Sequence, residues 1–305
     1  MAAKDGRDLP RVAVVVVNWN GVNDTIELVA SLLAQTYPNL SISVVDNGSD
    51  GGDAEALAQR FGARIRLVEL GDNRGCGGGY NAGVRAVLAD SPCDFIVIMN
   101  NDMTSAPDMV SELVSAAEAE AAVGVVGAKI YFAEYDGRRD VLWSAGGRFH
   151  PWGWRVHSRR GAGRVDEHEF DSAECVEWVS GATMLFRPEV YEAAGPFNER
   201  HILGYEDMEF CRRATAAGYG ILFAPRARSW HKVGVSAEKA HIKYTNPAAY
   251  YEFIRNCFPA HVYAFHICLL PSLLIKWGLL YLLRSRDSRA LRDFARQLGA
   301  FVVGR

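Results

Sequence analysis

Cysteine is scarce in this sequence, and no two cysteines are spaced for a shared task. The chain has six cysteines, with no CxxC pair and no zinc-ligand spacing. This pattern argues against a disulfide framework or a zinc module and is typical of unpaired thiols in a reducing compartment. The first ten residues also lack the apolar core of a secretory signal. We therefore expect a flexible tail over residues 1–10 and a folded part in the cytoplasm.

The sequence also has little net charge. Its formal charge is −3 at pH 7, and its pI is near 6.3. The chain as a whole therefore has no net positive charge to attract nucleic acid, so we exclude DNA and RNA as partners. Apolar residues make up 49% of the 305 residues, enough for one large core or two modest ones. The composition favours one α/β domain with an appendage.

Strand-like and helix-like segments alternate through the first 100 residues. Short β-branched runs predict strands over residues 11–17, 41–46, 64–70 and 95–100. Apolar residues at helical spacing predict helices over residues 24–35, 54–61 and 80–89. This alternation indicates a Rossmann-like, mainly parallel sheet with helices on both faces. Polar and glycine residues follow each strand, at the edge where open α/β sheets bind ligands.

The pattern loosens after Lys129. Residues 133–175 are rich in glycine, arginine, tryptophan and charge, which predicts an irregular, mobile segment over the site. Its tryptophans, Trp143, Trp152 and Trp154, suit either stacking on a sugar ring or anchoring the segment to the core. A strand-like run over residues 176–186 and a helix from Pro188 follow.

A glycine-rich stretch covers residues 71–83. It follows the third predicted strand rather than the first, and it has no Lys-Ser or Lys-Thr pair. Both absences disfavour a dinucleotide-binding dehydrogenase and a P-loop enzyme. Glycines let a backbone approach a ligand closely, and the helix over residues 80–89 would offer N–H groups to phosphate or sugar oxygens. The alternative is a flexible loop.

Six segments occur in a recognisable order: VVVVNWNG with VVDNGSDGG, NRGCGGGYN, MNND, GATMLFRPEVYEAAGPFNE, YEDME and HKVGVS. Together they resemble family-2 glycosyltransferases, especially the rhamnosyltransferase-like branch, over residues 11–240. The resemblance implies a GT-A fold with a nucleotide-sugar-binding half over 11–130 and an acceptor and catalytic-base half over 131–245. It also implies an inverting transfer of rhamnose or a related hexose from a dTDP or UDP sugar to a glycan or lipid-linked glycan.

The resemblance assigns residues to the donor. In the family, the counterpart of Asp46 accepts a hydrogen bond from a ring N–H of uracil or thymine, although Asp46 to Ser49 also reads as a simple turn. The family usually carries an aromatic residue where this chain has Cys76. The residues implied to bind the nucleotide sugar are Asn18, Asn20, Asp46, Asn73, Gly75, Asn81, Asn101 and Asp102.

The resemblance also assigns a metal and a base. Residues 100–102 occupy the place of the family's DxD motif, and His231 resembles a histidine that contacts the metal, so Asp102 and His231 are the implied ligands of Mg²⁺ or Mn²⁺. The alternative for His231 is an ordinary hydrogen-bonded side chain. Asp207 is the implied general base, and Glu206 helps to shape the acceptor pocket. Alternatively, both acids only favour a helix N-terminus.

The C-terminal segment over residues 246–305 differs from the rest. Residues 258–283 are apolar enough to reach across a bilayer core of about 30 Å, but Pro271 and Lys276 argue against a simple span. Residues 276–305 carry seven basic and two acidic side chains, with an apolar helical stripe. We expect a helical segment on the inner face of the cell membrane. The alternative is a helical hairpin packed on the core or in a dimer interface.

Two other functions stay open. A sugar nucleotidyltransferase would also bind a nucleotide and a sugar, but it would carry a basic glycine-rich loop where this chain has residues 18–21. A catalytically silent nucleotide-sugar-binding subunit is the second, because Asn100 stands where another carboxylate is common. The sequence leaves the oligomeric state open.

Overall fold

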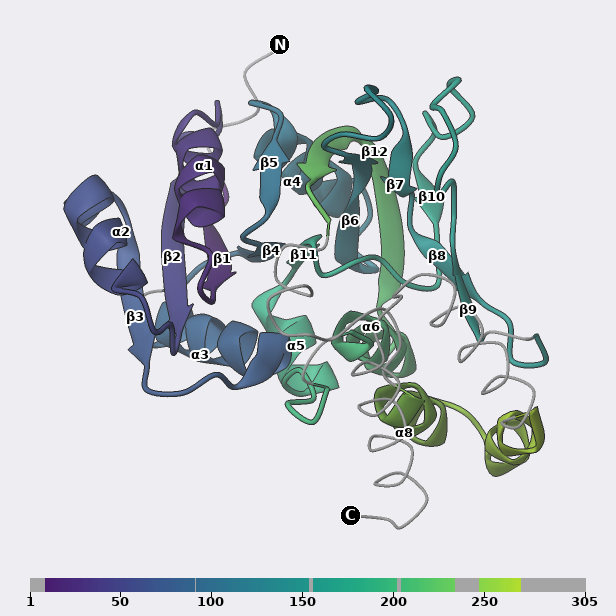
Figure 1. Cartoon of the computed structure of the whole chain (residues 1–305). Coiled ribbons are helices and arrows are strands. Elements are labelled where there is room, and N and C mark those ends of the chain that lie inside the picture. Colours follow the sequence, from purple (N-terminus) through teal and green to yellow (C-terminus); the bar gives the residue numbers. More distant parts are fainter. Residues whose placement is uncertain (1–8, 91, 154–155, 202–203, 234–246, 270–305) are drawn as a thin grey trace.

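The computed structural model describes residues 9–90, 92–153, 156–201, 204–233 and 247–269 (Figure 1). These residues form a mixed ten-stranded sheet whose main strand order is β10-β12-β6-β11-β4-β1-β2-β3. Strand β5 pairs with β12, and β7 pairs with β6. Strands β8 and β9 form a separate two-stranded sheet.

The first half of the chain has the predicted alternation. Its elements are β1 (Val12–Asn18), α1 (Val22–Leu33), β2 (Leu40–Asn47), α2 (Asp53–Phe61), the 3₁₀ helix η1 (Gly62–Arg64), β3 (Arg66–Leu70), α3 (Gly75–Asp90) and β4 (Phe95–Asn100). β1 is parallel to β2 and β4, and β2 is parallel to β3. All four predicted strands are confirmed, and their carboxyl ends lie at one edge of the sheet.

Both faces of the sheet are covered. Successive residues of β1 enter two different cores: Val14 packs with α1, α2 and α4, whereas Val15 packs with α3, α5 and α6. Figure 1 shows α3, α5 and α6 along one side of the sheet. The continuous β-branched run of β1 fits this placement, because a strand buried on both faces needs apolar residues at every position.

The second half of the chain is less regular. Its elements are β5 (Met103–Ser105), α4 (Met109–Ala119), β6 (Val123–Phe132), β7 (Leu142–Ser144), β8 (Gly147–Phe149), β9 (His157–Arg159), β10 (Glu174–Cys175), β11 (Thr183–Phe186), α5 (Pro188–Ala194), α6 (Glu206–Ala216), β12 (Gly220–His231) and α8 (Pro247–Cys257). A further helical segment covers residues 260–269. The long strand expected over 176–186 is reduced to β11.

The sheet is mainly parallel, as predicted, but it includes an antiparallel strand, β11, between two parallel groups. β12 is parallel to β6, but β11 is antiparallel to both of its neighbours, β4 and β6. β11 begins with Thr183 beside Met99, at the carboxyl edge, and runs back to Phe186 beside Ile96. The chain reaches β11 through irregular segments rather than a crossover helix, so it enters the sheet from the site edge.

The glycine-rich stretch is mostly helical, and its helix begins five residues before the predicted start at residue 80. Helix α3 begins at Gly75 and includes the glycines. A Cβ atom on Gly79 would lie 2.6 Å from Val17, and one on Gly83 would lie 2.3 Å from Val15. These glycines therefore allow α3 to lie close against β1, so their main role is helix–sheet packing.

The segment over residues 133–175 is anchored to the sheet at several points. Lys129 of β6 is 2% exposed, and its Nζ lies 2.8 Å from Asp166 and 2.6 Å from Asp171. Strands β7, β8 and β9 also lie within this segment. Trp143 is half-buried, Trp152 is 61% exposed, and Trp154 lies outside the described residues.

The start of the C-terminal segment packs on the core. Tyr250 of α8 has its hydroxyl 3.1 Å from Nδ1 of His266, and Nε2 of His266 lies 2.9 Å from the carbonyl oxygen of Pro151. The described part of this segment, up to residue 269, thus packs on the core. No helix in the part of the chain that the structure describes has the length and apolar character to cross a membrane. Residues 270–305 of the expected membrane-associated segment over 246–305 lie outside the described residues, as do residues 1–8 of the tail.

Candidate active site

Asn18 joins the loops that follow β1 and β2. Its Nδ2 donates to Asp46 at 2.8 Å and to Asp53 at 2.9 Å, and its Oδ1 accepts from Thr25 at 2.6 Å. The side chain is fully buried. Asn18 therefore orients Asp46 through a buried hydrogen bond. Asn18 is thus a positioning residue rather than a contact for a ligand.

Asp46 lies at the carboxyl end of β2 and is 5% exposed. Its Oδ1 accepts from Asn18 and from the Ser49 hydroxyl at 2.6 Å, and its Oδ2 accepts from the Ser49 backbone N–H at 3.2 Å. The turn expected here is present, and it fixes the carboxylate. Asn20 closes the same loop, because its Oδ1 accepts from the Asp50 N–H at 2.9 Å.

Asn73 and Gly75 form the entry to α3. Oδ1 of Asn73 accepts from the Gly75 N–H at 2.9 Å and from Nδ2 of Asn47 at 3.0 Å. Asn47 also accepts from the Arg74 N–H at 3.1 Å and donates to the Gly75 carbonyl at 3.1 Å. Asn47 is a site residue that sequence reasoning missed, although it directly follows Asp46.

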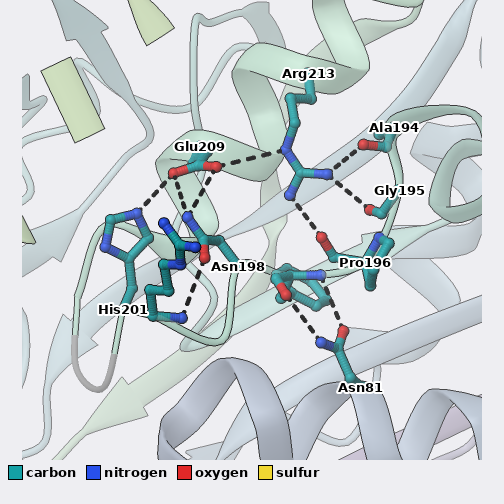
Figure 2. Close-up of polar contacts among 10 residues, drawn as sticks. Asn81, Ala194, Gly195, Pro196, Asn198, His201, Glu209 and Arg213 are labelled. Atoms are coloured by element: carbon teal, nitrogen blue, oxygen red, sulfur yellow. Dashed lines mark hydrogen bonds and ion pairs between the residues drawn. The ribbon is translucent and has the colours of Figure 1, made fainter. Parts of the chain in front are cut away.

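Asn81 does not face the site, which corrects its expected contact with the nucleotide sugar. Its Nδ2 donates to the carbonyl of Phe197 and to Glu199, and its Oδ1 accepts from the Phe197 N–H and the Tyr191 hydroxyl, all at 2.9 Å. Figure 2 shows Asn81 turned toward the loop that precedes α6. An amide offers two donors and two acceptors, so all of its positions are occupied.

The same loop is tied to α6 itself (Figure 2). Arg213 donates to the carbonyls of Gly195 at 2.9 Å and Pro196 at 2.8 Å. Glu209 lies 2.6 Å from Nε2 of His201 and accepts from Asn198 at 3.2 Å. These contacts fix the first turn of α6, where Glu206 and Asp207 lie, relative to α3.

Asp102 and His231 meet at the end of β4 and β12. Nε2 of His231 lies 3.1 Å from Oδ1 of Asp102. Both side chains are buried, and Nδ1 of His231 has no hydrogen-bond partner among the described residues. Burial by itself raises the pKa of Asp102, but the charge and hydrogen bond of His231 outweigh it, so this pKa lies below its usual value.

This pair fits a divalent cation that arrives with its substrate. Within the described residues, no group of three or more His, Cys, Asp or Glu side chains is placed to hold a metal. Mg²⁺ and Mn²⁺ are commonly held by one or two carboxylates together with substrate phosphates. Asp102 offers a carboxylate and His231 an imidazole, which are ligand types that these ions accept.

Asn100 and Asn101 directly precede Asp102, but their side chains bind other segments of the chain. Asn101 is 5% exposed, and its Nδ2 donates to Thr25 at 3.2 Å and to the Gly21 carbonyl at 3.4 Å. It holds the turn after β1 beside Asp102. Oδ1 of Asn100 accepts from the Tyr80 hydroxyl at 2.6 Å, which connects β4 to α3.

Glu206 and Asp207 open helix α6, as predicted. Burial, and then the charge of Asp207, raise the pKa of Glu206 to about 8. Burial also raises the pKa of Asp207, while the N–H groups of Gly181 and Met208 favour its charged form. Oδ2 of Asp207 accepts from Gly181 at 2.9 Å, and Oδ1 accepts from Met208 at 2.7 Å.

A series of hydrogen bonds connects Asn100, at the end of β4, to Asp207 of α6. The Tyr80 hydroxyl lies 2.6 Å from Asn100 and 3.3 Å from the Gly181 carbonyl, and Gly181 donates to Asp207. Sequence reasoning missed both Tyr80 and Gly181, which lie in segments that it had read as a helix and a strand.

Cys76 reports the same convergence. Burial, and then the charges of Glu206, Asp102 and Asp207, raise the pKa of its thiol. Cys76, at the start of α3, is therefore close enough to Asp102 and to both α6 carboxylates for their charges to affect it. The structure brings Asp46, Asp102, His231, Glu206 and Asp207 to one edge of the sheet.

The fold and the site together define a class of protein. The structure resembles a solved structure described as GalNAc-T7 with UDP, GalNAc and Mn²⁺, with a TM-score of 0.60 at 16% identity, over 73% of this chain and 43% of that one. The fold is thus a mixed α/β fold of the GT-A type. Residues 10–250 match the family described as Glycosyltransferase like family 2. The chain belongs to this family and is a glycosyltransferase.

Two relatives in sequence cover most of this chain, and one of them is described as a rhamnosyltransferase. An uncharacterised protein of Sinorhizobium fredii, y4gI, is 31% identical over 243 residues, which are 76% of this chain and 25% of the relative. This chain thus spans only about a quarter of that protein's length. A Mycobacterium tuberculosis N-acetylglucosaminyl-diphospho-decaprenol L-rhamnosyltransferase is 28% identical over 251 residues, with 78% of this chain and 79% of the relative covered.

Proposed function

We propose that this enzyme transfers rhamnose or a related hexose from a dTDP or UDP sugar to a hydroxyl group of a glycan or lipid-linked glycan, with inversion at the anomeric carbon. The observation that carries this proposal is the meeting of Asp46, the Asp102–His231 pair and the Glu206–Asp207 pair at one sheet edge. Each group has a distinct task in such a transfer.

Asp46 would recognise the base of the donor. A carboxylate accepts a hydrogen bond from the ring N–H of uracil or thymine, and Asn18 and Ser49 hold the Asp46 oxygens in place for it. Asn73 and Gly75 shape the start of α3, and helix N-termini attract phosphate groups. The donor would therefore lie along the carboxyl ends of β1, β2 and β4.

Asp102 and His231 would hold Mg²⁺ or Mn²⁺ beside the donor. Bound there, the metal would neutralise charge on the departing diphosphate. Their burial and their 3.1 Å separation keep the two side chains ready for this task. The M. tuberculosis relative is described as acting on a diphospho-decaprenol, which supports a lipid-linked acceptor here.

Asp207 would take the proton from the acceptor hydroxyl. A direct displacement needs one base on the side opposite the leaving group. Hydrogen bonds from Gly181 and Met208 favour the charged form of Asp207, while burial favours the neutral form of Glu206. This difference supports Asp207 as the base and Glu206 as a wall of the acceptor pocket.

The test is thermal stability of the purified protein with UDP, dTDP, GDP or CDP, with and without Mn²⁺. A ligand at 100 times its dissociation constant adds about 2.7 kcal/mol of stability. We expect UDP or dTDP to stabilise the wild type only with Mn²⁺, and Asp102→Ala to lose the effect. Stabilisation without sugar transfer would favour the silent binding subunit, and formation of a nucleotide sugar from a sugar phosphate would favour the nucleotidyltransferase.

A further inference from the structure

Thr25 of α1 lies between the loops that follow β1 and β4. Its side chain is fully buried. The hydroxyl lies 2.6 Å from Oδ1 of Asn18 and 3.2 Å from the Gly21 carbonyl, so its single hydrogen goes to Asn18, the nearer acceptor. The hydroxyl oxygen accepts from Nδ2 of Asn101 at 3.2 Å. Thr25 therefore joins the end of β1 to the loop after β4.

Each of these asparagines supports a carboxylate of the candidate active site. Asn18 donates at 2.8 Å to Asp46, which is the proposed partner of the donor base. Asn101 directly precedes Asp102, which is the proposed metal ligand. The three hydrogen bonds all point the same way, from Asn101 toward Asp46. Hydrogen bonds aligned in this way polarise and strengthen one another.

These hydrogen bonds lie in a closely packed interior. Asn18 is fully buried and Asn101 is 5% exposed. A Cβ atom on Gly21 would lie 2.4 Å from Nδ2 of Asn101, so this glycine lets α1 approach the amide closely. A buried polar group that loses its partner must shift to find another. A change at Thr25 therefore reaches both asparagines.

We propose that Thr25 is a positioning residue that couples recognition of the donor base to binding of the divalent metal. This inference rests on the proposed function and adds a residue to it. The hydroxyl of Thr25 holds Asn18, and through Asn18 it holds Asp46. The same hydroxyl holds Asn101, and so the backbone that leads into Asp102. The base and the metal of one nucleotide sugar are then bound by two carboxylates with a common support.

The experiment compares the full chain with Thr25→Val, which removes the hydroxyl and keeps the shape, and with Thr25→Ser, which keeps the hydroxyl. The first measurement is the dissociation constant of CDP divided by that of UDP or dTDP, at saturating Mn²⁺. This ratio reports on Asp46, because cytosine has no N–H at the ring position where uracil and thymine donate. The second is the dissociation constant of Mn²⁺ at saturating UDP or dTDP, from the electron paramagnetic resonance signal of free Mn²⁺.

We expect Thr25→Val to lower the nucleotide ratio by about tenfold, the scale of a lost hydrogen bond to a charged group. The dissociation constant of Mn²⁺ should rise by about tenfold or more, as for the loss of a residue that supports a metal ligand. Thr25→Ser should keep both values within a few-fold of the wild type. A residue with only a structural role would change the unfolding temperature and neither of these values.

The matched control is Thr183→Val on β11. Thr183 is also fully buried, and its hydroxyl donates to the Ala182 carbonyl at 2.8 Å and lies 3.1 Å from the Ser229 hydroxyl. We expect this variant to be less stable and to keep the nucleotide ratio and the Mn²⁺ dissociation constant of the wild type.

Thermal unfolding shows whether each variant is folded. If folded Thr25→Val keeps both values, or changes only one, the inference is overturned and the proposed function stands. If Thr25→Val does not fold, Gly21→Ala decides, because its methyl group displaces Asn101 and removes no hydroxyl. An unchanged Mn²⁺ dissociation constant in that variant overturns the inference. If the wild type itself binds no nucleotide with Mn²⁺, the proposed function fails first, and this inference fails with it.

Discussion

Glu206 and Asp207 are neighbours in the first turn of α6, yet their carboxyl groups have different hydrogen-bond partners. Glu206 is buried and Asp207 is partly buried. Oε2 of Glu206 has no hydrogen-bond partner among the described residues, whereas both oxygens of Asp207 accept backbone N–H groups. Adjacent acids in unlike surroundings take different protonation states. The surroundings of Glu206 therefore favour its neutral form, whereas the N–H groups around Asp207 favour its charged form and oppose the rise in its pKa that burial causes.

Asp207→Asn tests the proposed base. The amide keeps the shape of the side chain but cannot take a proton, so we expect turnover to fall by about 10² to 10⁴. The dissociation constant for UDP or dTDP should stay within a few-fold of the wild type. Initial rates of sugar transfer and a nucleotide titration check both parts. Unchanged turnover would remove Asp207 from this role.

Glu206→Gln tests the raised pKa through stability. The folded protein holds a proton on Glu206 up to about pH 8, while the unfolded chain releases it near the ordinary value of 4.5. The stability that the neutral form gives is complete below about pH 4.5 and is lost as the pH rises to about 8. Glutamine is neutral throughout and avoids this loss.

We therefore expect the unfolding free energy of Glu206→Gln minus that of the wild type to increase with pH. The increase should be up to about 1.4 kcal/mol per pH unit between about pH 5 and 8. Urea denaturation at a series of pH values measures this gain. The control is Glu189→Gln, an exposed carboxyl group in the first turn of α5. A constant difference for Glu206→Gln across this range would contradict the raised pKa.

Gly83→Ala tests the close packing of α3 on β1. The added methyl group would lie 2.3 Å from Val15 and 2.9 Å from Val45, so the helix must move. We expect a loss of about 1–3 kcal/mol, as for overpacked cores, despite the better helix propensity of alanine. Chemical denaturation measures it. Gly71→Ala is the control, because no atom lies within 4 Å of its added group, and an equal loss there would refute the packing argument.

A chain that ends after residue 269 tests membrane attachment. It keeps His266 and its contacts with α8 but loses a segment with seven basic and two acidic residues. We expect the full chain to sediment with vesicles that contain anionic lipid and the shortened chain to stay in solution. A full-length variant with Arg289, Arg292 and Arg296 changed to glutamine should bind more weakly. Sedimentation of the shortened chain would place the attachment elsewhere.

The sequence by itself determined the first half of the fold. β1 is apolar at successive positions because both of its faces are buried, and such a run is readable without a structure. The polar residues after each strand also had to lie at one edge, since parallel strands end on the same side. Asp46 and Asp102 were therefore predictable, as was the helix that begins at Glu206.

Only the tertiary structure decided which of these polar residues face the site. Asn81 and Asn73 lie in the same glycine-rich stretch, so the local sequence does not distinguish them. Four hydrogen bonds with distant segments hold the Asn81 side chain in the core. The antiparallel entry of β11 and the approach of His231 to Asp102 depend on contacts between segments far apart in the chain. Local periodicity reports which face of an element is apolar, whereas the pairing of distant loops depends on packing of the whole molecule.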